Sequence, residues 1–354
     1  MNNLHGSVII TYRCNAHCNM CNCFMDPTKK EEEISLETIR RLPKMKFTNI
    51  TGGEPFIRDD IDEIVEELYK KTDRIVISTN GFFYKRILEL CKRFPRVGIR
   101  ISIEGMPKTN DAVRGIPDGF DHGLRCLLQL VANGHKDVGF GMTVQDMNAD
   151  DLLLLYDLAD DMGMEFATAS LHNSFYFRKT DNAIRDKYHV AQQFEKLINA
   201  MLKSGSPKKW FRAYFNHGLI NYIYGNPRLL PCEMGSNGFF IDPFGDVLPC
   251  NGMDKKMPMG NLNTQTWDEI WNSEQADKVR RAVKVRRAVK SCPKNCWMIG
   301  SVSPAMKQHL AVPARWVLYH KFVKRGYSLG ENDFIKAVQN IENRDDRTET
   351  HPVP

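Results

Sequence analysis

Residues 7–21 read SVIITYRCNAHCNMC, and this stretch decides how the rest of the chain is interpreted. Its first six residues are mostly β-branched, which predicts a strand. Cys14, Cys18 and Cys21 follow that strand with the spacing Cys-x3-Cys-x2-Cys. Three thiolates at this spacing can bind three irons of a [4Fe–4S] cube and leave the fourth iron open. A structural zinc site, completed by Cys23 or His17, is the alternative.

Short β-rich segments alternate with helix-period segments over the first two thirds of the chain. The other expected strands cover residues 49–51, 74–79, 98–103, 139–144 and 166–170. Six successive β-then-α units predict an α/β fold with a parallel sheet. Ser35 is expected to cap the helix that follows it, and Asp60 with Glu63 predicts a capping box.

Polar or glycine-rich groups follow several of the expected strands. Residues 52–55 (GGEP) follow the second strand, Ser78 and Asn80 end the third, and Ser102 and Glu104 end the fourth. Ligands of parallel sheets bind at the carboxyl ends of the strands. We therefore expect these groups and the cysteine loop to lie close together at the carboxyl-terminal edge of the sheet.

The composition is that of an ordinary globular chain of 354 residues, 42% hydrophobic and 26% charged, with a net charge of +6. No stretch approaches the roughly 20 consecutive apolar residues of a membrane helix, and the first residues lack the features of a signal peptide. We therefore expect a cytoplasmic protein. In a reducing compartment, ten cysteines indicate metal or redox chemistry rather than disulfides. Cys91 and Cys126, inside apolar helical patterns, are expected to be core residues.

The organisation changes near Pro207, beyond which Gly, Pro and Asn become frequent. Residues 237–249 (NGFFIDPFGDVLP) predict a hairpin with its turn at 242–245, and a helix is expected over about 266–289. A second cysteine group accompanies these elements: Cys232, Cys250, Cys292 and Cys296. Four cysteines suit a fully ligated [4Fe–4S] cluster, and a four-cysteine zinc site is the alternative.

The first cysteine group, the GGEP segment and residues 102–105 (SIEG) with Asp111 and Arg114 occur in the order typical of the radical S-adenosylmethionine (SAM) superfamily, which the chain resembles. Glu104 stands where the family usually has Asp, and Asn110 where His is frequent. The resemblance implies reductive cleavage of SAM at the first cluster. It also implies cofactor contacts from Met20, Gly52, Gly53, Glu54, Pro55, Ser78, Asn80, Ser102, Glu104 and Arg114.

The segments DPFGDVLPC and GNLNTQTWDEIWNSEQ resemble the C-terminal SPASM or twitch extension of these enzymes, which carries auxiliary clusters. Part of the full SPASM cysteine pattern is missing, so we expect one auxiliary cluster without a free iron. The resemblance implies a partial (β/α)6 TIM-like barrel over residues 1–206 and a small α+β iron–sulfur domain over 207–312. A helical tail with a disordered end is expected over 313–354.

The resemblance also implies an external electron donor of the flavodoxin or ferredoxin type and a 5′-deoxyadenosyl radical that takes hydrogen from the substrate. Loss of a proton and transfer of an electron to the auxiliary cluster would complete a two-electron oxidation. His172 and Tyr176 are candidate bases, and Arg178 is a candidate for holding an anion. An ordinary loop or core role is the alternative for each.

The first cluster cysteine is residue 14, which leaves no room before it for a peptide-recognition domain. We therefore expect a small polar substrate: a sugar, an aminocyclitol or a nucleotide sugar. A peptide-modifying SPASM maturase is the alternative, and epimerisation with a thiol such as Cys23 also stays open.

A third hypothesis is a zinc protein that binds nucleic acid through residues 278–290, where KVRRAV occurs twice. Recognised nucleic-acid motifs are absent. A solvated helix or a phosphate-binding face with Arg280, Arg281, Arg286 and Arg287 are further interpretations of this repeat.

Overall fold

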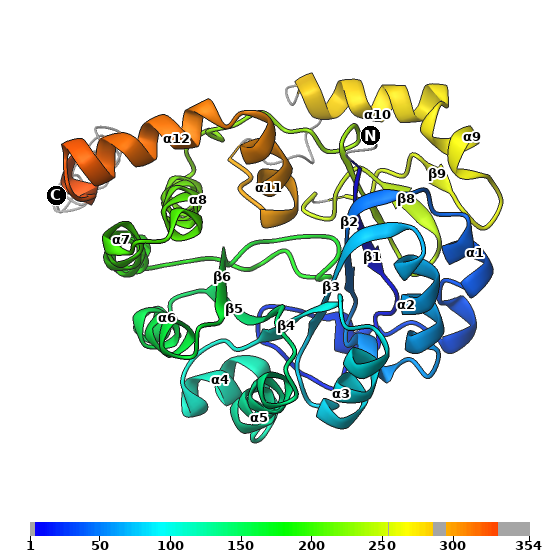
Figure 1. Ribbon diagram of the computed structural model, residues 1–354. Coiled ribbons are helices and arrows are strands. Elements are labelled where there is room, and N and C mark those ends of the chain that lie inside the picture. Colours follow the sequence, from blue (N-terminus) through cyan, green and yellow to red (C-terminus); the bar gives the residue numbers. More distant parts are fainter. Residues whose placement is uncertain (1–3, 254, 286–294, 332–354) are drawn as a thin grey trace, which may run out of the picture.

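The computed structural model describes residues 4–253, 255–285 and 295–331. Its strands form one sheet in the order β6-β5-β4-β3-β2-β1-β7-β8-β9 (Figure 1). The strands are β1 (His5–Ile9), β2 (Met45–Thr51), β3 (Thr72–Thr79), β4 (Gly98–Ser102), β5 (Val138–Val144), β6 (Glu165–Ser170), β7 (Gly238–Ile241), β8 (Asp246–Leu248) and β9 (Gly260–Asn261). Strands β1 to β6 are mutually parallel. The predicted α/β fold with a partial (β/α)6 barrel is confirmed.

Helices that follow the barrel strands cover the outer face of the curved sheet, and further helices follow in the C-terminal part of the chain (Figure 1). They are α1 (Leu36–Arg40), α2 (Ile61–Tyr69), α3 (Tyr84–Arg93), α4 (Pro107–Arg114), α5 (Gly119–Ala132), α6 (Asp151–Asp161), α7 (Lys187–Lys203), α8 (Pro207–Ile223), α9 (Trp267–Trp271), α10 (Glu274–Val285), α11 (Ile299–Gln308) and α12 (Ala311–Leu318). Cys91 and Cys126 are buried in the main apolar core, as predicted. No helix in the described part of the chain is both long and apolar enough to span a membrane.

The two predicted helix caps have different outcomes. Ser35 caps α1, because its hydroxyl accepts a hydrogen bond from the Thr38 backbone N–H at 3.1 Å. The capping box at Asp60 and Glu63 is wrong, because Asp60 makes no cap hydrogen bond. Its carboxylate instead accepts two hydrogen bonds from Arg58, at 2.6 and 2.8 Å. A bidentate ion pair with a guanidinium is stronger than a single hydrogen bond from a neutral backbone N–H.

The inner face of the barrel carries small and polar side chains. Side chains alternate between the two faces of a strand, and one set packs outward into the core, as Ile50, Ile77, Ile99 and Ile101 do. The opposite set lines a cavity: Asn49, Thr51, Ser78, Ser102, Gly141, Thr143, Ala167 and Ala169. In a closed barrel such layers are filled by Val, Ile and Leu. Here the inner side chains toward the carboxyl ends of the strands are too small to fill the space, so the barrel stays hollow there.

The sheet continues past the barrel into the C-terminal part of the chain. β7 pairs in parallel with β1, from His5 opposite Gly238 to Val8 opposite Ile241. β7 and β8 form the predicted hairpin, with Gly245 at a φ of 82° in its turn. The single helix expected over 266–289 is divided into α9 and α10. The chain section that starts with α8 at Pro207 is therefore joined to the barrel through shared strand pairing.

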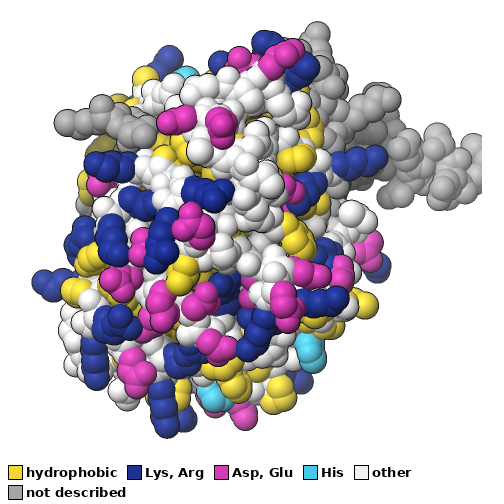
Figure 2. Space-filling model, turned by 90° about the vertical axis from the view of Figure 1, so that its right-hand side faces the viewer, with side chains coloured by type: hydrophobic (Ala, Val, Ile, Leu, Met, Phe, Trp, Pro, Cys, Tyr) yellow, Lys and Arg dark blue, Asp and Glu magenta, His cyan; other side chains and the backbone are white. Residues whose placement is uncertain are grey.

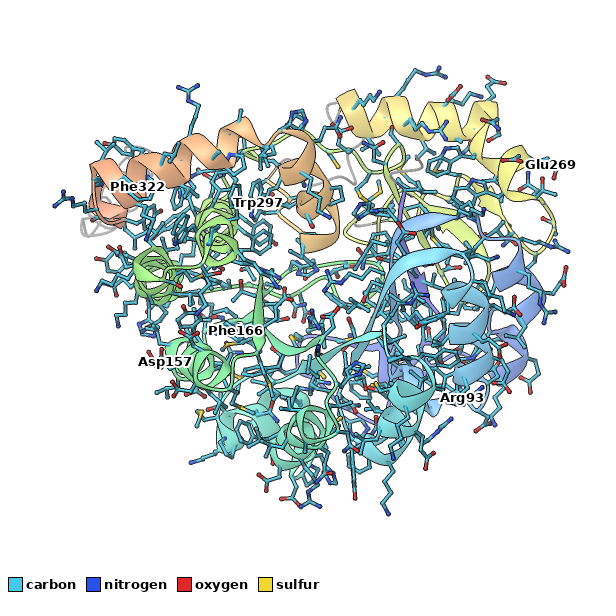
Figure 3. All side chains as sticks on the ribbon, in the orientation of Figure 1. Arg93, Asp157, Phe166, Glu269, Trp297 and Phe322 are labelled. Carbon is cyan, nitrogen blue, oxygen red and sulfur yellow. The ribbon has the colours of Figure 1, made fainter. Side chains whose placement is uncertain are left out.

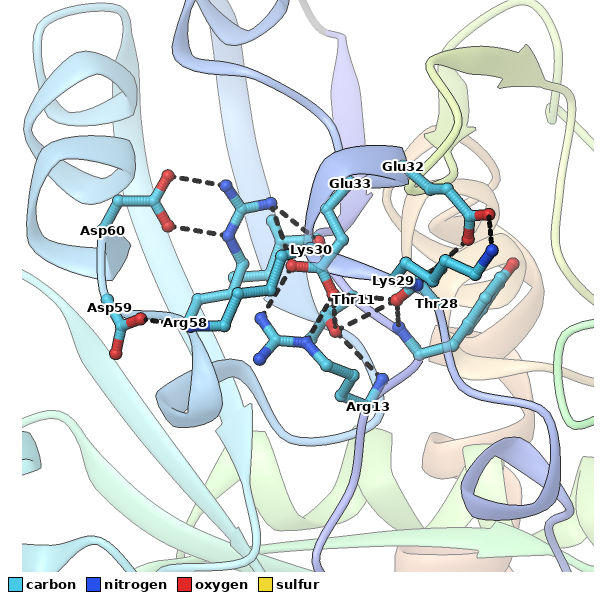
Figure 4. A network of polar contacts seen from close by, with 12 residues as sticks. Thr11, Arg13, Thr28, Lys29, Lys30, Glu32, Glu33, Arg58, Asp59 and Asp60 are labelled. Atoms are coloured by element: carbon cyan, nitrogen blue, oxygen red, sulfur yellow. Dashed lines mark hydrogen bonds and ion pairs between the residues drawn. The ribbon is translucent and has the colours of Figure 1, made fainter.

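The chain between β1 and the first cysteine is held by a buried polar network (Figure 4). Glu33 accepts hydrogen bonds from Thr11, from Thr28 at 2.8 Å, and from two nitrogens of Arg13 at 2.8 and 2.9 Å. Arg58 donates to the Ile10 carbonyl at 3.0 Å and lies 3.9 Å from Glu33. Burial alone would raise the pKa of Glu33, but these hydrogen bonds outweigh it, so its pKa lies below the ordinary value.

Glu33→Gln should destabilise the protein by about 2 kcal/mol at neutral pH, because Arg13 loses its charged partner. The native carboxylate contributes this stability above the pKa of an unfolded glutamate, about 4.3, and loses it as the pH falls further. The difference between variant and wild type should therefore shrink below about pH 4. Urea unfolding at several pH values measures it. Glu37→Gln, which alters only an exposed pair with Arg41, is the control. Equal effects of the two substitutions would contradict this role.

Candidate iron–sulfur and cofactor site

A cavity of about 820 Å³ occupies the barrel and opens beside the cysteine loop. Of the predicted site residues, the following line it: Cys14, Cys18, Met20, Cys21, Gly52, Gly53, Ser78, Asn80, Ser102, Glu104, Arg114, His172 and Tyr176. Glu54, Pro55 and Arg178 do not belong to its lining. The carboxyl ends of the strands therefore bring most of the predicted residues into one space.

The cysteine loop is held in place through its backbone. The N–H groups of His17 and Asn19 donate to the carbonyls of Arg114 and Val113 at 3.0 and 2.9 Å. Gly115 ends α4 with a φ of 59°, and an added Cβ there would lie 2.6 Å from the His17 carbonyl oxygen. Only glycine combines this conformation with this close approach. The end of α4 therefore holds the backbone of the cysteine loop in place.

The three thiols do not have the same environment. Burial raises the pKa of Cys14 to about 12 and raises that of Cys18. A hydrogen bond from Cys23 lowers the pKa of Cys21. Cluster ligands must be deprotonated, so binding iron here would release protons and supply the positive charge that buried thiolates need. Arg114 supplies part of that charge, because its guanidinium partly offsets the effect of burial on the pKa of Cys18 and contributes to the lowered pKa of Cys21.

Cys23 is buried behind the cysteine loop, outside the set of predicted ligands. Its Sγ lies 3.2 Å from the Tyr176 carbonyl oxygen. Among the described residues, no three Cys, His, Asp or Glu side chains converge on a point suited to a single metal ion. A cluster differs in this respect, since each of its cysteines binds a different iron. The donor set fits a cluster better than a single zinc ion.

Gly52 and Gly53 let the strand ends approach each other. The N–H of Gly53 donates to the Thr11 carbonyl and that of Glu54 to the Arg13 carbonyl, both at 2.8 Å. A Cβ at Gly53 would lie 2.2 Å from the Arg13 oxygen, inside contact distance of backbone that cannot move freely. The glycines therefore connect the end of β2 to the chain leading into Cys14.

Glu54 is fully buried and cross-links two strand ends. Its carboxylate accepts hydrogen bonds from the Phe56 N–H at 3.1 Å and from the Thr79 hydroxyl and Asn80 N–H at 2.7 Å. Asn80 in turn donates to Asn15 in the cysteine loop at 2.7 Å. Glu54 thus orients Asn80 from behind the cavity wall.

Glu104 and Asn110, the two departures from the family pattern, form a connected pair. The side-chain oxygen of Asn110 accepts a hydrogen bond from the Glu104 backbone N–H at 2.8 Å. The Glu104 carboxylate accepts a hydrogen bond from the Thr143 backbone N–H at 2.6 Å. Its other oxygen lies 3.5 Å from the Arg114 guanidinium. Burial raises the pKa of Glu104 to about 7. A carboxyl group poised in this range can accept a hydrogen bond from a ligand hydroxyl when ionised and donate one when protonated.

Residues 171–182 form a loop after β6 that contacts both cysteine regions. Asn22 donates its N–H to the Phe177 carbonyl at 2.8 Å, and Asn182 donates to the Met20 carbonyl at 3.1 Å. On the other side, the Phe175 N–H donates to the Met253 carbonyl at 3.0 Å, beyond Cys250. This loop physically links the first cysteine loop to the second.

The three predicted catalytic residues lie in this loop in different settings. The Tyr176 hydroxyl donates to the Gly52 carbonyl at 2.5 Å, and burial raises its pKa well above the ordinary value. His172 contacts the Ser170 carbonyl through Nδ1 at 3.0 Å, and burial lowers its pKa. Arg178 pairs with Asp26 and stacks on Tyr12, its guanidinium carbon 4.6 Å from the ring centre. Only His172 and Tyr176 line the cavity.

The second cysteine group is assembled from distant segments. Cys232 and Cys250 pack against one small apolar cluster that also contains Tyr12 and Tyr176. Arg228 connects this region to Cys296, donating to the Cys296 carbonyl at 3.2 Å and the Leu230 carbonyl at 2.8 Å. Cys292, the fourth predicted ligand, lies outside the described residues.

Trp297, next to Cys296, anchors that ligand to α8. Its indole is fully buried and its Nε1 donates to the Phe215 carbonyl at 2.8 Å. Figure 3 shows the ring between α8 and α11. Gly218 makes room for it, since a Cβ there would lie 1.9 Å from the indole. Sequence reasoning missed Trp297, Gly218 and Arg228, because their partners are distant in the chain.

The basic repeat is partly structural. Arg280 donates to the carbonyls of Gly235 and Trp271 at 2.7 and 2.5 Å and stacks on the Trp271 ring. Its guanidinium is therefore committed to the fold instead of to a phosphate. Arg286 and Arg287 lie outside the described residues.

Comparison with known families agrees with these two sites. The sequence model of the radical SAM superfamily matches residues 8–159, and that of the SPASM iron–sulfur cluster-binding domain matches residues 232–297. The chain therefore contains a radical SAM domain and a SPASM iron–sulfur domain. The first match includes Cys14, Cys18 and Cys21, and the second starts at Cys232 and extends past Cys296. A SAM-binding cluster, an auxiliary iron–sulfur cluster and SAM are therefore its cofactors.

Its relatives include a bacteriocin biosynthesis protein and a maturase. The chain is 25% identical over 296 residues to the antilisterial bacteriocin subtilosin biosynthesis protein AlbA of Bacillus subtilis, covering 79% of this chain and 62% of AlbA. It is 26% identical over 292 residues to the mycofactocin maturase MftC of Mycolicibacterium smegmatis, covering 80% of this chain and 74% of MftC. The chain thus spans less than two thirds of the length of AlbA.

A solved structure with the same fold is Streptococcus suis SuiB bound to precursor peptide SuiA. Its TM-score is 0.58 at 16% identity, over 79% of this chain and 66% of SuiB. At this identity the likeness establishes the fold alone.

Gly218→Ala should reduce loading of the auxiliary cluster, because the added methyl displaces Trp297 and with it Cys296. We expect iron in reconstituted protein to fall from about eight toward about four atoms per chain, with SAM cleavage retained. Iron analysis and low-temperature EPR measure this. Gly205→Ala is the control, since nothing lies within 4 Å of a Cβ at that position. Full iron content in Gly218→Ala would refute the role of this contact.

Proposed function

We propose that this radical SAM enzyme modifies a peptide, instead of the small polar metabolite expected from the sequence. The alignments to AlbA and MftC carry this proposal, because they extend over 79–80% of the chain, across the radical SAM and SPASM domains. Relatives that shared only the cofactor chemistry would match the first domain alone. The sugar, aminocyclitol and nucleotide-sugar hypotheses have no comparable support.

The length of the cavity supports a peptide substrate. Arg74 and Asn80 both line it and are six residues apart along the chain at β3. At about 3.3 Å per residue, the cavity extends for about 20 Å. An extended peptide segment matches this length, whereas a single sugar ring occupies a small part of it. The polar inner faces of the strands offer hydrogen-bonding partners along the way.

SAM held at the first cluster would supply radical chemistry, with a flavodoxin- or ferredoxin-type protein as the electron donor. Cys14, Cys18 and Cys21 would hold that cluster, and Cys232, Cys250, Cys292 and Cys296 the auxiliary one. SAM would contact the cavity wall made by Met20, Gly52, Gly53, Ser78, Asn80, Ser102, Glu104 and Arg114. Glu54 and Pro55 would act from behind this wall.

His172 is the better of the candidate bases. A carbonyl oxygen only accepts hydrogen bonds, so the contact with Ser170 places the proton on Nδ1 and leaves Nε2 basic. Burial lowers its pKa and keeps the ring neutral near pH 7. Tyr176 is poorly suited, because its raised pKa keeps the hydroxyl protonated. We assign Tyr176 to positioning Gly52, and Arg178 to holding the loop against Tyr12.

The substrate class can be tested with short peptides encoded beside the gene. The reconstituted, reduced enzyme should form 5′-deoxyadenosine faster with its cognate peptide, and that peptide should change in mass. Mass spectrometry measures both products, and Cys14→Ala, which removes a cluster ligand, is the control. Stimulation by sugars or nucleotide sugars, without modification of any encoded peptide, would reject the proposal.

His172→Gln and Tyr176→Phe should have separable effects once a substrate is known. His172→Gln should lower product formation by about 100-fold while 5′-deoxyadenosine still forms, because proton removal follows hydrogen abstraction. Tyr176→Phe should weaken SAM binding by about fivefold, since one hydrogen bond to Gly52 is lost, with the ratio of product to 5′-deoxyadenosine unchanged. The opposite pattern would transfer the base role to Tyr176.

A further inference from the structure

A cluster of charged residues lies at the end of the cavity opposite the cysteine loop. Arg74 in the first half of β3, Arg100 in the middle of β4 and Glu165 at the start of β6 line the cavity. Lys208 and Arg212 from the first turns of α8 line it beside them. These residues belong to neither cysteine site.

The cations of this cluster outnumber its carboxylates. Glu165 is shared by Arg100 at 2.7 Å, Lys208 at 2.9 Å and Arg212. Asp137 is shared by Arg74 at 3.0 Å and Arg100 at 2.6 Å. Four cations thus face two carboxylates. One further cation, Lys307 on α11, lines the cavity near His5, whose pKa is lowered mainly by burial and additionally by the charge of Lys307.

The same excess holds for the whole cavity. Its described lining contains six Lys and Arg side chains but only two carboxylates, Glu104 and Glu165. The face of the molecule in Figure 2 instead shows acidic and basic side chains interspersed. A hollow whose lining has an excess of one sign of charge concentrates ligands of the other sign. Arg100 and Arg212 are 13% and 21% exposed, so their charges are only partly screened by water.

We propose that this cluster binds a carboxylate side chain of the peptide substrate, so that the enzyme acts on an acidic peptide. This inference rests on the proposed function and adds the substrate's charge to it. Arg100 lies four residues before Glu104, and Arg74 six before Asn80, which corresponds to about 13–20 Å along the strands. An extended peptide anchored here therefore places its reacting residue about four to six positions from its Asp or Glu.

The test uses the reconstituted holoenzyme with SAM and two fluorescein-labelled hexapeptides, one alternating glycine with glutamate and one alternating glycine with glutamine. Fluorescence anisotropy should show at least about tenfold tighter binding of the glutamate peptide. That preference should decline as salt is raised from about 50 to 500 mM. Equal affinity of the two peptides would overturn the proposal.

Substitutions of single lysines on α8 and α11 test whether the glutamate peptide binds at this cluster. Lys208→Gln should weaken binding of the glutamate peptide by about fivefold. Lys209→Gln should not, because Lys209 pairs with Asp160 outside the cavity. Lys307→Gln tests the opposite wall without disturbing Glu165 and should also weaken binding. Equal effects of Lys208→Gln and Lys209→Gln would overturn the assignment to this cluster.

Two further measurements separate the alternatives. A single-stranded hexadeoxynucleotide that displaces the glutamate peptide at equal or lower concentration would show a general polyanion surface and overturn the peptide assignment. If an encoded peptide is modified at the same rate by Lys208→Gln and Lys307→Gln, the charge inference fails while the proposed function stands. If the glutamate peptide binds as expected but no encoded peptide is modified, the proposed function fails instead.

Discussion

The inner faces of the barrel strands cannot fill the space that they enclose, and the rest of the structure depends on this constraint. Where a closed barrel would place Val, Ile or Leu, this chain has residues such as Asn49, Ser78, Ser102 and Gly141. The stabilising apolar surface therefore lies almost entirely between the outer faces of the strands and the helices. A hollow centre leaves room for a cofactor and an extended substrate on the same axis.

A hollow barrel needs its rim held by specific polar contacts, because no core supports it from within. Glu33 binds the segment that leads to Cys14, and Glu54 joins the ends of β2 and β3. Both carboxylates are buried, and each receives several hydrogen bonds, which compensates for the loss of water. Such contacts have well-defined geometry, so they fix the positions of the cysteine loop and of Asn80 more strictly than apolar packing would.

The two cysteine regions are mechanically connected. Residues 171–182 contact the loop of Cys21 on one side and the loop after Cys250 on the other, while β7 extends the barrel sheet directly from β1. The apolar cluster around Tyr12 and Tyr176 lies between Cys21 and Cys232. A change at one cysteine region can therefore be transmitted to the other through packed contacts.

The sequence alone determined the order of the six barrel strands and of most helices between them, because hydrophobic periodicity is a local property. It also identified Cys14, Cys18 and Cys21, whose spacing is itself the signal, and the buried roles of Cys91 and Cys126. Only the tertiary structure showed that Asp60 binds Arg58 instead of capping its helix, that Gly218 makes room for Trp297, and that Arg100 and Arg212 share Glu165. Each of these contacts depends on which side chains the fold brings together and on which of several possible partners forms the stronger contact. The pattern of residues along the chain does not encode either.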